Sequence, residues 1–263
     1  MLRLTGINKT FFPGTVNERK ALVGVDLHLK PRDFVTVIGS NGAGKSTLLN
    51  IVSGSIRAES GLVEIAGNDV TKLADYRRAQ FVGRVFQDPS AGTAPHMTIE
   101  ENLAMAAQRG KHRFLGTAVN SAKRAKFRED LEMLEQGLES RLDDWVGLLS
   151  GGQRQSLSLL MATFTHPQIL LLDEHTAALD PQRAALVTKL TAELVEKHNL
   201  TTLMVTHNME QALAMGNRLI MMHQGRIIMD VEGEQKASMK VSDLLGAFEK
   251  MRGGGLSDRT LLA

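Results

Sequence analysis

A glycine-rich stretch near the N-terminus has the residue types needed to hold phosphate groups. Residues 39–47 read G-S-N-G-A-G-K-S-T, which fits the pattern G-x-x-x-x-G-K-[ST]. Glycines let the backbone turn until its N–H groups face phosphate oxygens, and a following helix N-terminus adds partial positive charge. Lys45 could reach the outer phosphates of a nucleoside triphosphate, and the Ser46 hydroxyl could bind Mg²⁺. The residues expected to contact phosphate are Gly39, Ser40, Asn41, Gly42, Ala43, Gly44, Lys45, Ser46 and Thr47.

Two adjacent carboxylates follow an apolar run later in the chain. Asp173 and Glu174 come directly after residues 169–172, which read I-L-L-L and are typical of a buried strand. An aspartate at a strand end can bind Mg²⁺ or its water, and the next carboxylate can act as general base for an attacking water. We therefore expect Asp173 to bind metal and Glu174 to be the general base.

A third segment offers a second place for an anion. Residues 149–153 read L-S-G-G-Q, so a serine hydroxyl and two glycines lead into the helical run 153–159. A helix that begins this way suits an anion at its N-terminus. Because one chain would then have two phosphate-binding helix ends but a single glycine-rich phosphate loop (the P-loop, residues 39–47), the sequence suggests a site shared between chains.

The residues that could bind ligands or take part in catalysis follow four predicted strands. These strands cover residues 34–38, 81–86, 169–172 and 202–206, and they alternate with longer helical patterns, as in a sheet with helices on both faces. In open α/β sheets, ligands bind beyond the carboxyl ends of the strands. The residues that follow the predicted strands are Gly39, Gln87, Asp173 and His207.

The segment from about residue 89 to residue 148 differs from its surroundings because strand patterns vanish. It predicts an inserted helical subdomain, with acids in the first turn of a helix near residues 98–103. Residues 102–128 contain seven bases and no acid, which we interpret as a solvated or lipid-facing surface, since no aromatic stacking platform accompanies them. These bases are Arg109, Lys111, Arg113, Lys123, Arg124, Lys126 and Arg128.

The order of these motifs resembles that of the ATP-binding cassette (ABC) ATPases. The L-S-G-G-Q segment, which resembles the signature motif of this family, lies about 105 residues after Lys45. The L-L-L-D-E segment follows it, and the likeness extends from residue 4 to about residue 245. The resemblance implies an α/β fold: a P-loop NTPase, RecA-like core with a mainly parallel sheet, antiparallel β elements and an inserted helical subdomain. It also implies head-to-tail dimers that trap two ATP molecules with Mg²⁺.

We expect the following domain organisation from these patterns. Residues 1–88 and 164–245 form the nucleotide-binding core, residues 89–163 form the helical subdomain with the signature motif, and residues 246–263 form a C-terminal tail. Within the core, residues 218–230 predict a hairpin. The glycines from residue 253 onward predict a flexible end.

The resemblance assigns roles to further residues. Gln87 matches the Q-loop glutamine, which senses Mg²⁺ and water and couples the site to a membrane partner. His207 matches the switch histidine, which donates a hydrogen bond to the γ-phosphate. Asp180 lies in the D-loop, which crosses the dimer seam. The residues implied to contact ATP bound to the other chain are Ser150, Gly151, Gly152 and Gln153.

The sequence also offers a candidate for adenine binding and departs from the family pattern at two places. Phe11 precedes the P-loop by about the family distance and is the candidate for stacking on adenine, with Phe12 as the alternative. His175 stands where most importer ATPases have the proline of D-E-P-T, which we interpret as a subfamily marker without a catalytic role. The helix after the signature lacks the arginine usual in A-R-A-L, which is the second departure from the family pattern.

Composition excludes several classes of protein. The chain of 263 residues has 31 Lys plus Arg and 29 Asp plus Glu, so a net charge of +2 does not favour nucleic acid as a partner. The absence of cysteine excludes a disulfide framework, a thiolate zinc site, an iron–sulfur cluster and a cysteine nucleophile. The longest apolar run has five residues, and the start carries no secretion signal, so we expect a soluble intracellular chain.

Together these features predict the ATPase subunit of a bacterial ABC importer. Its implied partners are a second copy of the chain, separate membrane permeases that hold it at the cytoplasmic face of the membrane and, indirectly, a solute-binding protein. The motif set D-E-H-T-A-A-L-D at residues 173–180 resembles a poorly characterised branch, and we expect an amino-acid-like, aromatic solute. The alternative is a soluble ABC ATPase that serves iron–sulfur scaffold assembly or a nucleic-acid machine. A signalling GTPase is disfavoured by the S-G-G-Q segment.

Overall fold

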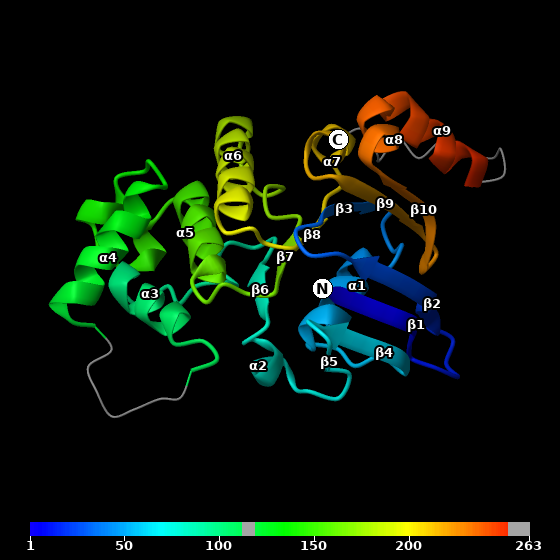
Figure 1. The fold of residues 1–263 in the computed structure, drawn as a ribbon, viewed down its shortest axis with the longest axis horizontal. Helices are drawn as coiled ribbons and strands as arrows, with labels where there is room; N and C mark the ends of the chain where they lie inside the picture. Colours follow the sequence, from blue (N-terminus) through cyan, green and yellow to red (C-terminus); the bar gives the residue numbers. More distant parts are fainter. Residues whose placement is uncertain (112–118, 252–263) are drawn as a thin grey trace. The chain divides into compact units, whose positions relative to one another are not determined.

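The computed structural model describes residues 1–111 and 119–251. The part of the basic stretch at residues 112–118 and the tail from residue 252 lie outside the described residues. The described chain divides into two compact units. Unit 1 comprises residues 1–52, 56–71 and those from 203 onward, and unit 2 comprises residues 53–55 and 72–202 (Figure 1). No helix in the described ranges has the length and apolar character needed to cross a bilayer.

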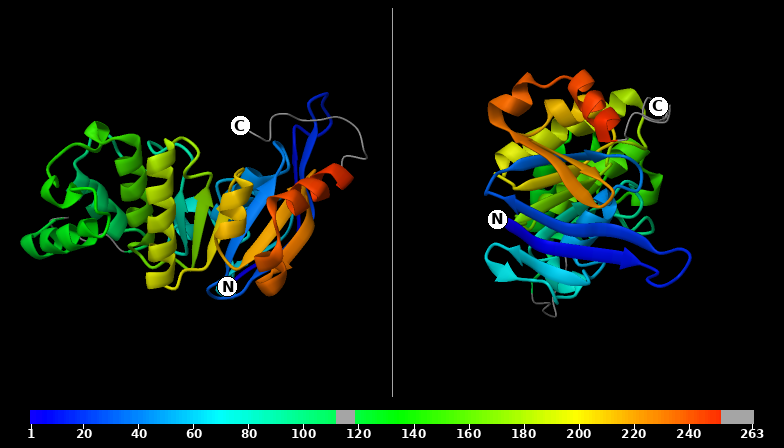
Figure 2. Two further views of the ribbon diagram at one scale, coloured as in Figure 1. Left: turned by 90° about the horizontal axis from the view of Figure 1, so that it is seen from above. Right: turned by 90° about the vertical axis from the view of Figure 1, so that its right-hand side faces the viewer.

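Unit 1 contains an antiparallel sheet built from the N-terminal part of the chain. Its strand order is β2-β1-β4-β5. The right-hand view of Figure 2 shows β1 and β2 as a long antiparallel pair in blue. Leu2 and Leu4 are buried while Arg3 is exposed, which is the alternation of a strand with one face on a core. The strands are β1 (Leu2–Phe11), β2 (Arg19–Leu29), β4 (Ser60–Ile65) and β5 (Asn68–Asp69).

The second set of strands in unit 1 follows the order β10-β9-β3-β8. Strand β3 (Phe34–Gly39) is buried throughout and runs parallel to β9 (Arg218–His223), with Val35 opposite Arg218 and Gly39 opposite Met222. Strand β10 (Arg226–Glu232) pairs antiparallel with β9, so the predicted hairpin is present. Strand β8 covers Thr202–Val205. The helices of this unit are α1 (Lys45–Ser53), α7 (Met209–Ala214), α8 (Gly233–Ser238) and α9 (Val241–Met251).

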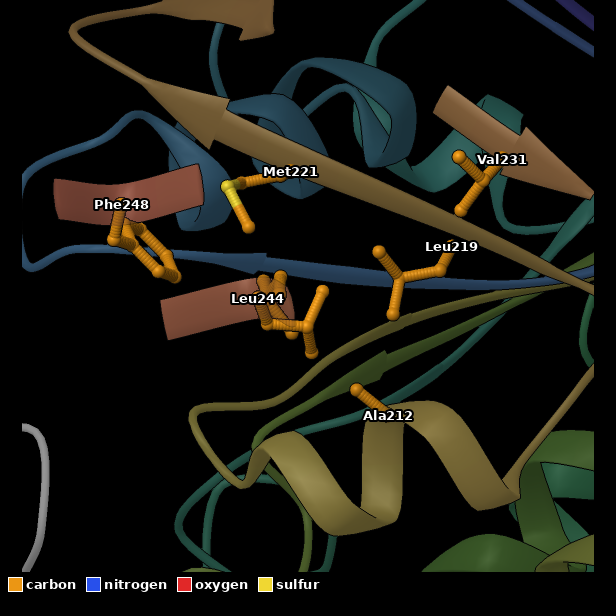
Figure 3. Close-up of a cluster of buried hydrophobic side chains, with 7 residues drawn as sticks. Ala212, Leu219, Met221, Val231, Leu244 and Phe248 are labelled. Atoms are coloured by element: carbon orange, nitrogen blue, oxygen red, sulfur yellow. The ribbon is translucent and has the colours of Figure 1, made fainter. Parts of the chain in front are cut away.

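An apolar cluster attaches the last helix to this part of unit 1. Leu244 and Phe248 of α9 pack with side chains of β3, α7, β9 and β10 (Figure 3). Phe248 is only 4% exposed, so α9 continues as a packed helix across residue 245, the end of the core in the sequence-based division. The buried members of the cluster are Ile38, Ala212, Leu219, Met221, Val231, Leu244 and Phe248.

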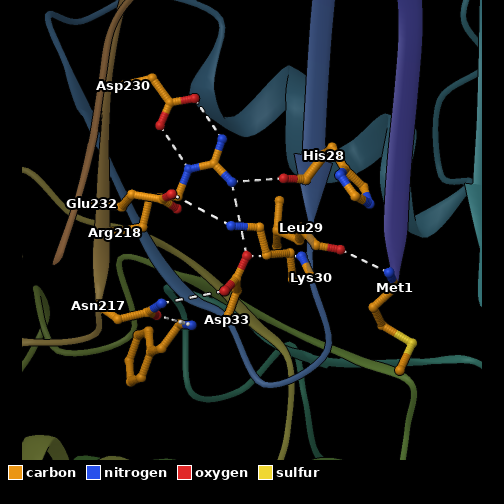
Figure 4. A network of polar contacts seen from close by, with 10 residues as sticks. Met1, His28, Leu29, Lys30, Asp33, Asn217, Arg218, Asp230 and Glu232 are labelled. Atoms are coloured by element: carbon orange, nitrogen blue, oxygen red, sulfur yellow. Dashed lines mark hydrogen bonds and ion pairs between the residues drawn. The ribbon is translucent and has the colours of Figure 1, made fainter.

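A polar network around Arg218 fixes the entry to β3 (Figure 4). Arg218 donates through Nε and Nη2 to the two carboxylate oxygens of Asp230 at 2.6 and 2.5 Å, and through Nη1 to the carbonyl oxygen of His28 at 2.6 Å. These bonds to Asp230 raise the pKa of Arg218. Asn217 donates to Asp33 at 3.2 Å and accepts from the N–H of Phe34 at 2.7 Å. A bidentate arginine has little rotational freedom, so the network holds β2, β3, β9 and β10 in register.

Unit 2 has a short parallel strand pair with helices around it. Strand β6 (Val82–Val85) runs parallel to β7 (Ile169–Asp173), with Val82 opposite Ile169. A Cβ on Gly83 would lie 2.4 Å from the carbonyl oxygen of Ala162, so helix α5 packs directly on the β6 backbone. The helices are α2 (Asp75–Arg78), α3 (Ile99–Ala107), α4 (Ser121–Glu132), η1 (Leu138–Ser140), η2 (Val146–Leu148), α5 (Gly151–Thr163) and α6 (Pro181–Lys197).

The sequence predicts that residues 89–148 contain no strands, and the described part of this segment agrees. It forms helices and turns, with a single isolated β-bridge between Thr98 and Trp145. Thr98 begins α3 with a reciprocal cap, because Glu101 donates its N–H to the threonine hydroxyl while its carboxylate accepts from the Thr98 N–H. The expected fold class, α/β with parallel and antiparallel strands and a helical insertion, is confirmed.

His175 is buried in unit 2 directly after the paired carboxylates. Its ring is 2% exposed, and its Nε2 lies 3.0 Å from Thr191 Oγ1. Thr191 donates its hydroxyl to the carbonyl oxygen of Val187 at 2.7 Å, so the imidazole supplies the proton of its own bond to Thr191. Burial lowers the pKa of His175 to about 4. The ring therefore acts as a neutral core group that attaches the segment after β7 to α6.

The buried imidazole predicts a loss of stability in acid. Between its unfolded pKa of 6.5 and its folded pKa of about 4, the unfolded chain binds more protons than the folded chain. His175 should therefore stabilise the fold fully above pH 6.5, and this contribution should fall by about 3 kcal/mol as the pH drops to 4. His175→Gln keeps a donor to Thr191 but does not titrate. Urea unfolding from pH 7 to pH 4 should show a shallower decline for this variant, and an unchanged slope would contradict the assignment.

Candidate functional site

The glycine-rich loop in unit 1 follows β3 and turns tightly into α1. At Gly44, φ is +103° and a Cβ would lie 2.4 Å from the carbonyl oxygen of Ala21 in β2. The turn between β9 and β10 packs on the same loop, because Gly225 donates its N–H to the carbonyl oxygen of Ala43 at 3.0 Å. The loop is therefore held by strand β2 and by the β9–β10 turn, and helix α1 begins at its end with Lys45. A helix N-terminus with glycines before it forms a cradle for an anion.

Lys45 lies inside this loop. Its side chain is 6% exposed, and its Nζ donates to the carbonyl oxygens of Gly39 at 2.6 Å and Ser40 at 3.3 Å. The amine is thus held within reach of the loop's own backbone, where a phosphate oxygen could replace a carbonyl oxygen as its acceptor. Ser46 follows on the first turn of α1 and is exposed.

The two aromatic candidates differ in their surroundings. Phe11 is the last residue of β1, is half-buried and pairs across the sheet with Arg19 of β2. Phe12 lies beyond the strand with φ +52° and is 66% exposed. Arg19 in turn donates from Nη2 to the carbonyl oxygen of Gly42 at 3.0 Å. Phe11 is therefore connected through one residue to the glycine-rich loop, which favours it over Phe12 as a ring near a bound nucleotide.

His207 shares unit 1 with the glycine-rich loop. It follows β8 and is exposed, and the preceding residue, Thr206, donates its N–H to the carbonyl oxygen of Val37 in β3 at 3.2 Å. Thr206 also donates its hydroxyl to Gln211 at 2.8 Å, while Asn208 caps α7. Because β8 and β3 are neighbours and Thr206 bonds to Val37, His207 follows directly after a contact with the strand that leads to Gly39.

Unit 2 brings together the residues that follow β6 and β7. Asp173 is the half-buried last residue of β7, and its Oδ2 lies 3.2 Å from Nη2 of Arg84 on β6. Glu174 follows with φ +44°, a left-handed backbone that is unfavourable for glutamate. Gln87 is exposed in the turn after β6. The parallel strands β6 and β7 thus place two carboxylates, Asp173 and Glu174, and the amide of Gln87 at one edge.

The signature segment forms the start of helix α5. Ser150 caps the helix, accepting from the N–H of Gln153 at 3.3 Å, while Gln153 accepts from the N–H of Ser150 at 3.1 Å. Gly151 and Gly152 form the first turn. A Cβ on Gly152 would lie 2.8 Å from Cδ of Arg183, so the arginine covers this glycine. The serine oxygen accepts one bond and can still donate its proton to an anion.

Asp180 caps the next helix and joins this arrangement. It accepts from the N–H of Arg183 at 3.1 Å, and its carboxylate lies 3.2 Å from Arg183 Nε. Arg183 therefore bridges the signature helix and the D-loop within unit 2. Sequence reasoning missed three arginines beside the expected site residues, namely Arg19, Arg84 and Arg183, because their partners are set by strand pairing and helix packing rather than by a local motif.

Comparisons with known proteins agree with these motifs. Residues 22–177 match the family described as ABC transporter. The tyrosine transport ATP-binding protein of Clostridioides difficile is 45% identical over 95% of this chain and 99% of its own length. The aliphatic sulfonates import ATP-binding protein SsuB 1 of Paraburkholderia xenovorans is 34% identical over 87% of this chain and 59% of its own length.

Solved structures resemble the fold over most of the chain. A dimeric ATP-binding cassette in a post-hydrolysis state with ADP and Pi matches with a TM-score of 0.75 and 29% identity, over 88% of this chain and 98% of that one. The ADP conformation of an ATP-binding cassette of an ABC transporter matches with a TM-score of 0.78 and 28% identity, over 95% of this chain and 98% of that one.

The close approach at Gly44 predicts a difference between two glycine variants. Both Gly44→Ala and Gly42→Ala force alanine into a positive φ, which costs about 1–2 kcal/mol. At Gly44 the new methyl also meets the Ala21 backbone, and such overpacking costs about 1–3 kcal/mol more. At Gly42 it meets only the movable end of Arg19. Denaturant unfolding should show Gly44→Ala as clearly the less stable variant, whereas equal stabilities would contradict this loop geometry.

Proposed function

Because the chain belongs to the ABC transporter family, we propose that it is the ATPase subunit of an importer for an amino-acid-like, aromatic solute such as tyrosine. The observation that carries the solute class is the end-to-end similarity to the tyrosine transport ATP-binding protein of Clostridioides difficile. Solute selectivity in such an importer belongs to other subunits, so the relative's name guides the choice of solute to test. The match to import proteins for sulfonates and for spermidine or putrescine favours import over the assembly alternative.

ATP is the substrate that fits the loop between β3 and α1. The glycine backbone leaves room that a Cβ would fill, and Lys45 can exchange its carbonyl acceptors for phosphate oxygens. Phe11 stacks on adenine. Mg²⁺ suits the hard oxygen donors of Ser46, Asp173 and Gln87, and when bound it neutralises charge on the phosphates.

The chain's own polar groups then perform hydrolysis. Glu174 takes a proton from the attacking water, and Gln87 orients that water. His207 donates a hydrogen bond to the γ-phosphate, and Lys45 balances negative charge that develops on it. The left-handed backbone of Glu174 fits this role, because a strained conformation at a site residue is retained where it aims the side chain.

A second copy of the chain completes each site in this proposal. The start of α5 presents the Ser150 hydroxyl proton and the N–H groups of Gly151 and Gly152 to ATP bound on the other copy. Asp180 lies at the seam, held by Arg183. The cofactor contacts proposed for this segment are those of Ser150, Gly151, Gly152 and Gln153.

Transport requires partners that span the membrane. We place the dimer on membrane permease subunits at the cytoplasmic face, with a solute-binding protein delivering the solute to those permeases. The exposed Gln87 follows β6 and is suited to transmit the state of the site to a permease. Nucleic acid is not among the proposed partners, since the net charge is only +2.

Substituting the general base tests the function. In vesicles that contain the permeases, the wild-type chain should couple ATP hydrolysis to uptake of an aromatic amino acid. Glu174→Gln should keep ATP bound, favour a stable dimer and lower both hydrolysis and uptake by about 10²–10⁴-fold, because the water loses its base. Glu193→Gln, on the exposed face of α6, serves as the matched control with normal rates.

Two results would contradict the proposal, one for the assigned base and one for the importer function. Near-normal hydrolysis by Glu174→Gln would reject the assigned base. Hydrolysis by the wild-type chain without uptake of any solute taken by the binding protein would reject the importer.

A further inference from the structure

Arg84 contacts Asp173, a proposed site residue, but has no role in the function proposed above. It lies on β6 with a side chain only 13% exposed, and its Nη2 is 3.2 Å from Oδ2 of Asp173. Strand register explains the contact, because Arg84 lies opposite Leu171 and Asp173 is two residues further along the same strand face. The pairing is therefore built into the β6–β7 strand pair.

The same guanidinium group reaches the segment that leads to Gln87. Its central carbon lies 4.5 Å from the centroid of the Phe86 ring, and Phe86 directly precedes Gln87. The carbonyl oxygen of Phe86 accepts a 3.0 Å bond from the fully buried Gln155 of α5. Phe86 is thus held on two sides, by a cation over its ring and by an amide on its backbone.

A third contact fixes the arginine itself. Its Nη1 donates to the hydroxyl of Ser53 at 3.2 Å. The planar guanidinium group is therefore fixed by a carboxylate, a hydroxyl and an aromatic ring, all within unit 2. Desolvating a partly buried ion pair costs free energy that its attraction offsets only with good geometry, so the pair is weak evidence for stability alone.

We propose that Arg84 is a positioning residue for ATP hydrolysis, which holds the Asp173 carboxylate in place, limits the negative charge it presents to Mg²⁺ and joins it to the Phe86–Gln87 segment. This proposal rests on the function proposed above. A cation beside a carboxylate competes with a second cation for the same negative charge. Arg84 therefore lowers the affinity of Asp173 for metal but fixes the orientation of its carboxylate.

Removing the charge of Arg84 should therefore raise the metal affinity and lower the turnover. Arg84→Met keeps an unbranched, largely apolar side chain beside Phe86 but removes the guanidinium group and its charge. Mn²⁺ binding to the chain with a non-hydrolysable ATP analogue, measured by electron paramagnetic resonance, should tighten about three- to tenfold because the competing cation is gone. The kcat for Mg²⁺-ATP should fall about tenfold or more, because the carboxylate loses its orientation.

Two further variants separate positioning from a merely structural role. Arg84→Lys keeps the charge, so Mn²⁺ affinity should return to the wild-type value, with partial recovery of kcat. Arg141→Met removes a half-buried arginine paired with Asp144 in unit 2 and should change neither quantity. The unfolding temperature of each variant shows whether the substitution lowers the stability of the fold.

The outcomes are distinct. Tighter Mn²⁺ binding with slower turnover in Arg84→Met, reversed in affinity by lysine, supports the proposal. Weaker binding with slower turnover and a lower unfolding temperature would assign Arg84 a structural role only, and unchanged binding and turnover would assign it none. Failure of the proposed function would appear separately, as a wild-type chain that does not hydrolyse ATP or does so without Glu174.

Discussion

The packing of the glycine-rich loop against strand β2 and the β9–β10 turn is the constraint on which the rest of unit 1 depends. The loop can turn into α1 only because Gly44 and Gly225 let backbone approach backbone beside Ala21. That approach keeps β2 beside the loop, and β2 pairs with β1, which ends at Phe11. The Arg218 network and the cluster around α9 hold β3 and β9, from which the loop and the Gly225 turn emerge.

Unit 2 holds polar side chains in place at the ends of apolar strands. Asp173 ends a strand whose other residues are fully buried, so its charge needs a local partner, and Arg84 supplies one. The capped starts of α5 and α6 order the backbone at Ser150 and Asp180, while Arg183 connects them. His175, neutral and bonded to Thr191, anchors the strained segment after β7 without exposing a charge.

Local motifs could be predicted from the sequence, whereas contacts between distant segments could not. The loop at 39–47, the strand ends at Gln87 and Asp173 and the capped start of α5 all depend on neighbours within a few residues. The antiparallel strands β1, β2 and β4 are not among the strands predicted from the sequence. Buried and exposed residues alternate over Leu2–Leu4 and Val25–Leu29, but register shifts interrupt the pairing of β1 with β2 and β4. The roles of Arg19 and Arg84 depend on strand register, and that of His175 depends on a partner 16 residues away.

The central claim is that each active site combines the P-loop of one copy with the signature helix of another. Mixing two inactive variants tests this most directly: Lys45→Ala removes the phosphate lysine, and Ser150→Arg blocks the helix start. Each variant alone should hydrolyse ATP at background rates, whereas a mixture of the two should regain a substantial fraction of wild-type activity, because mixed dimers contain one intact site. A mixture that stays at background, with mixed dimers verified, would contradict the shared site.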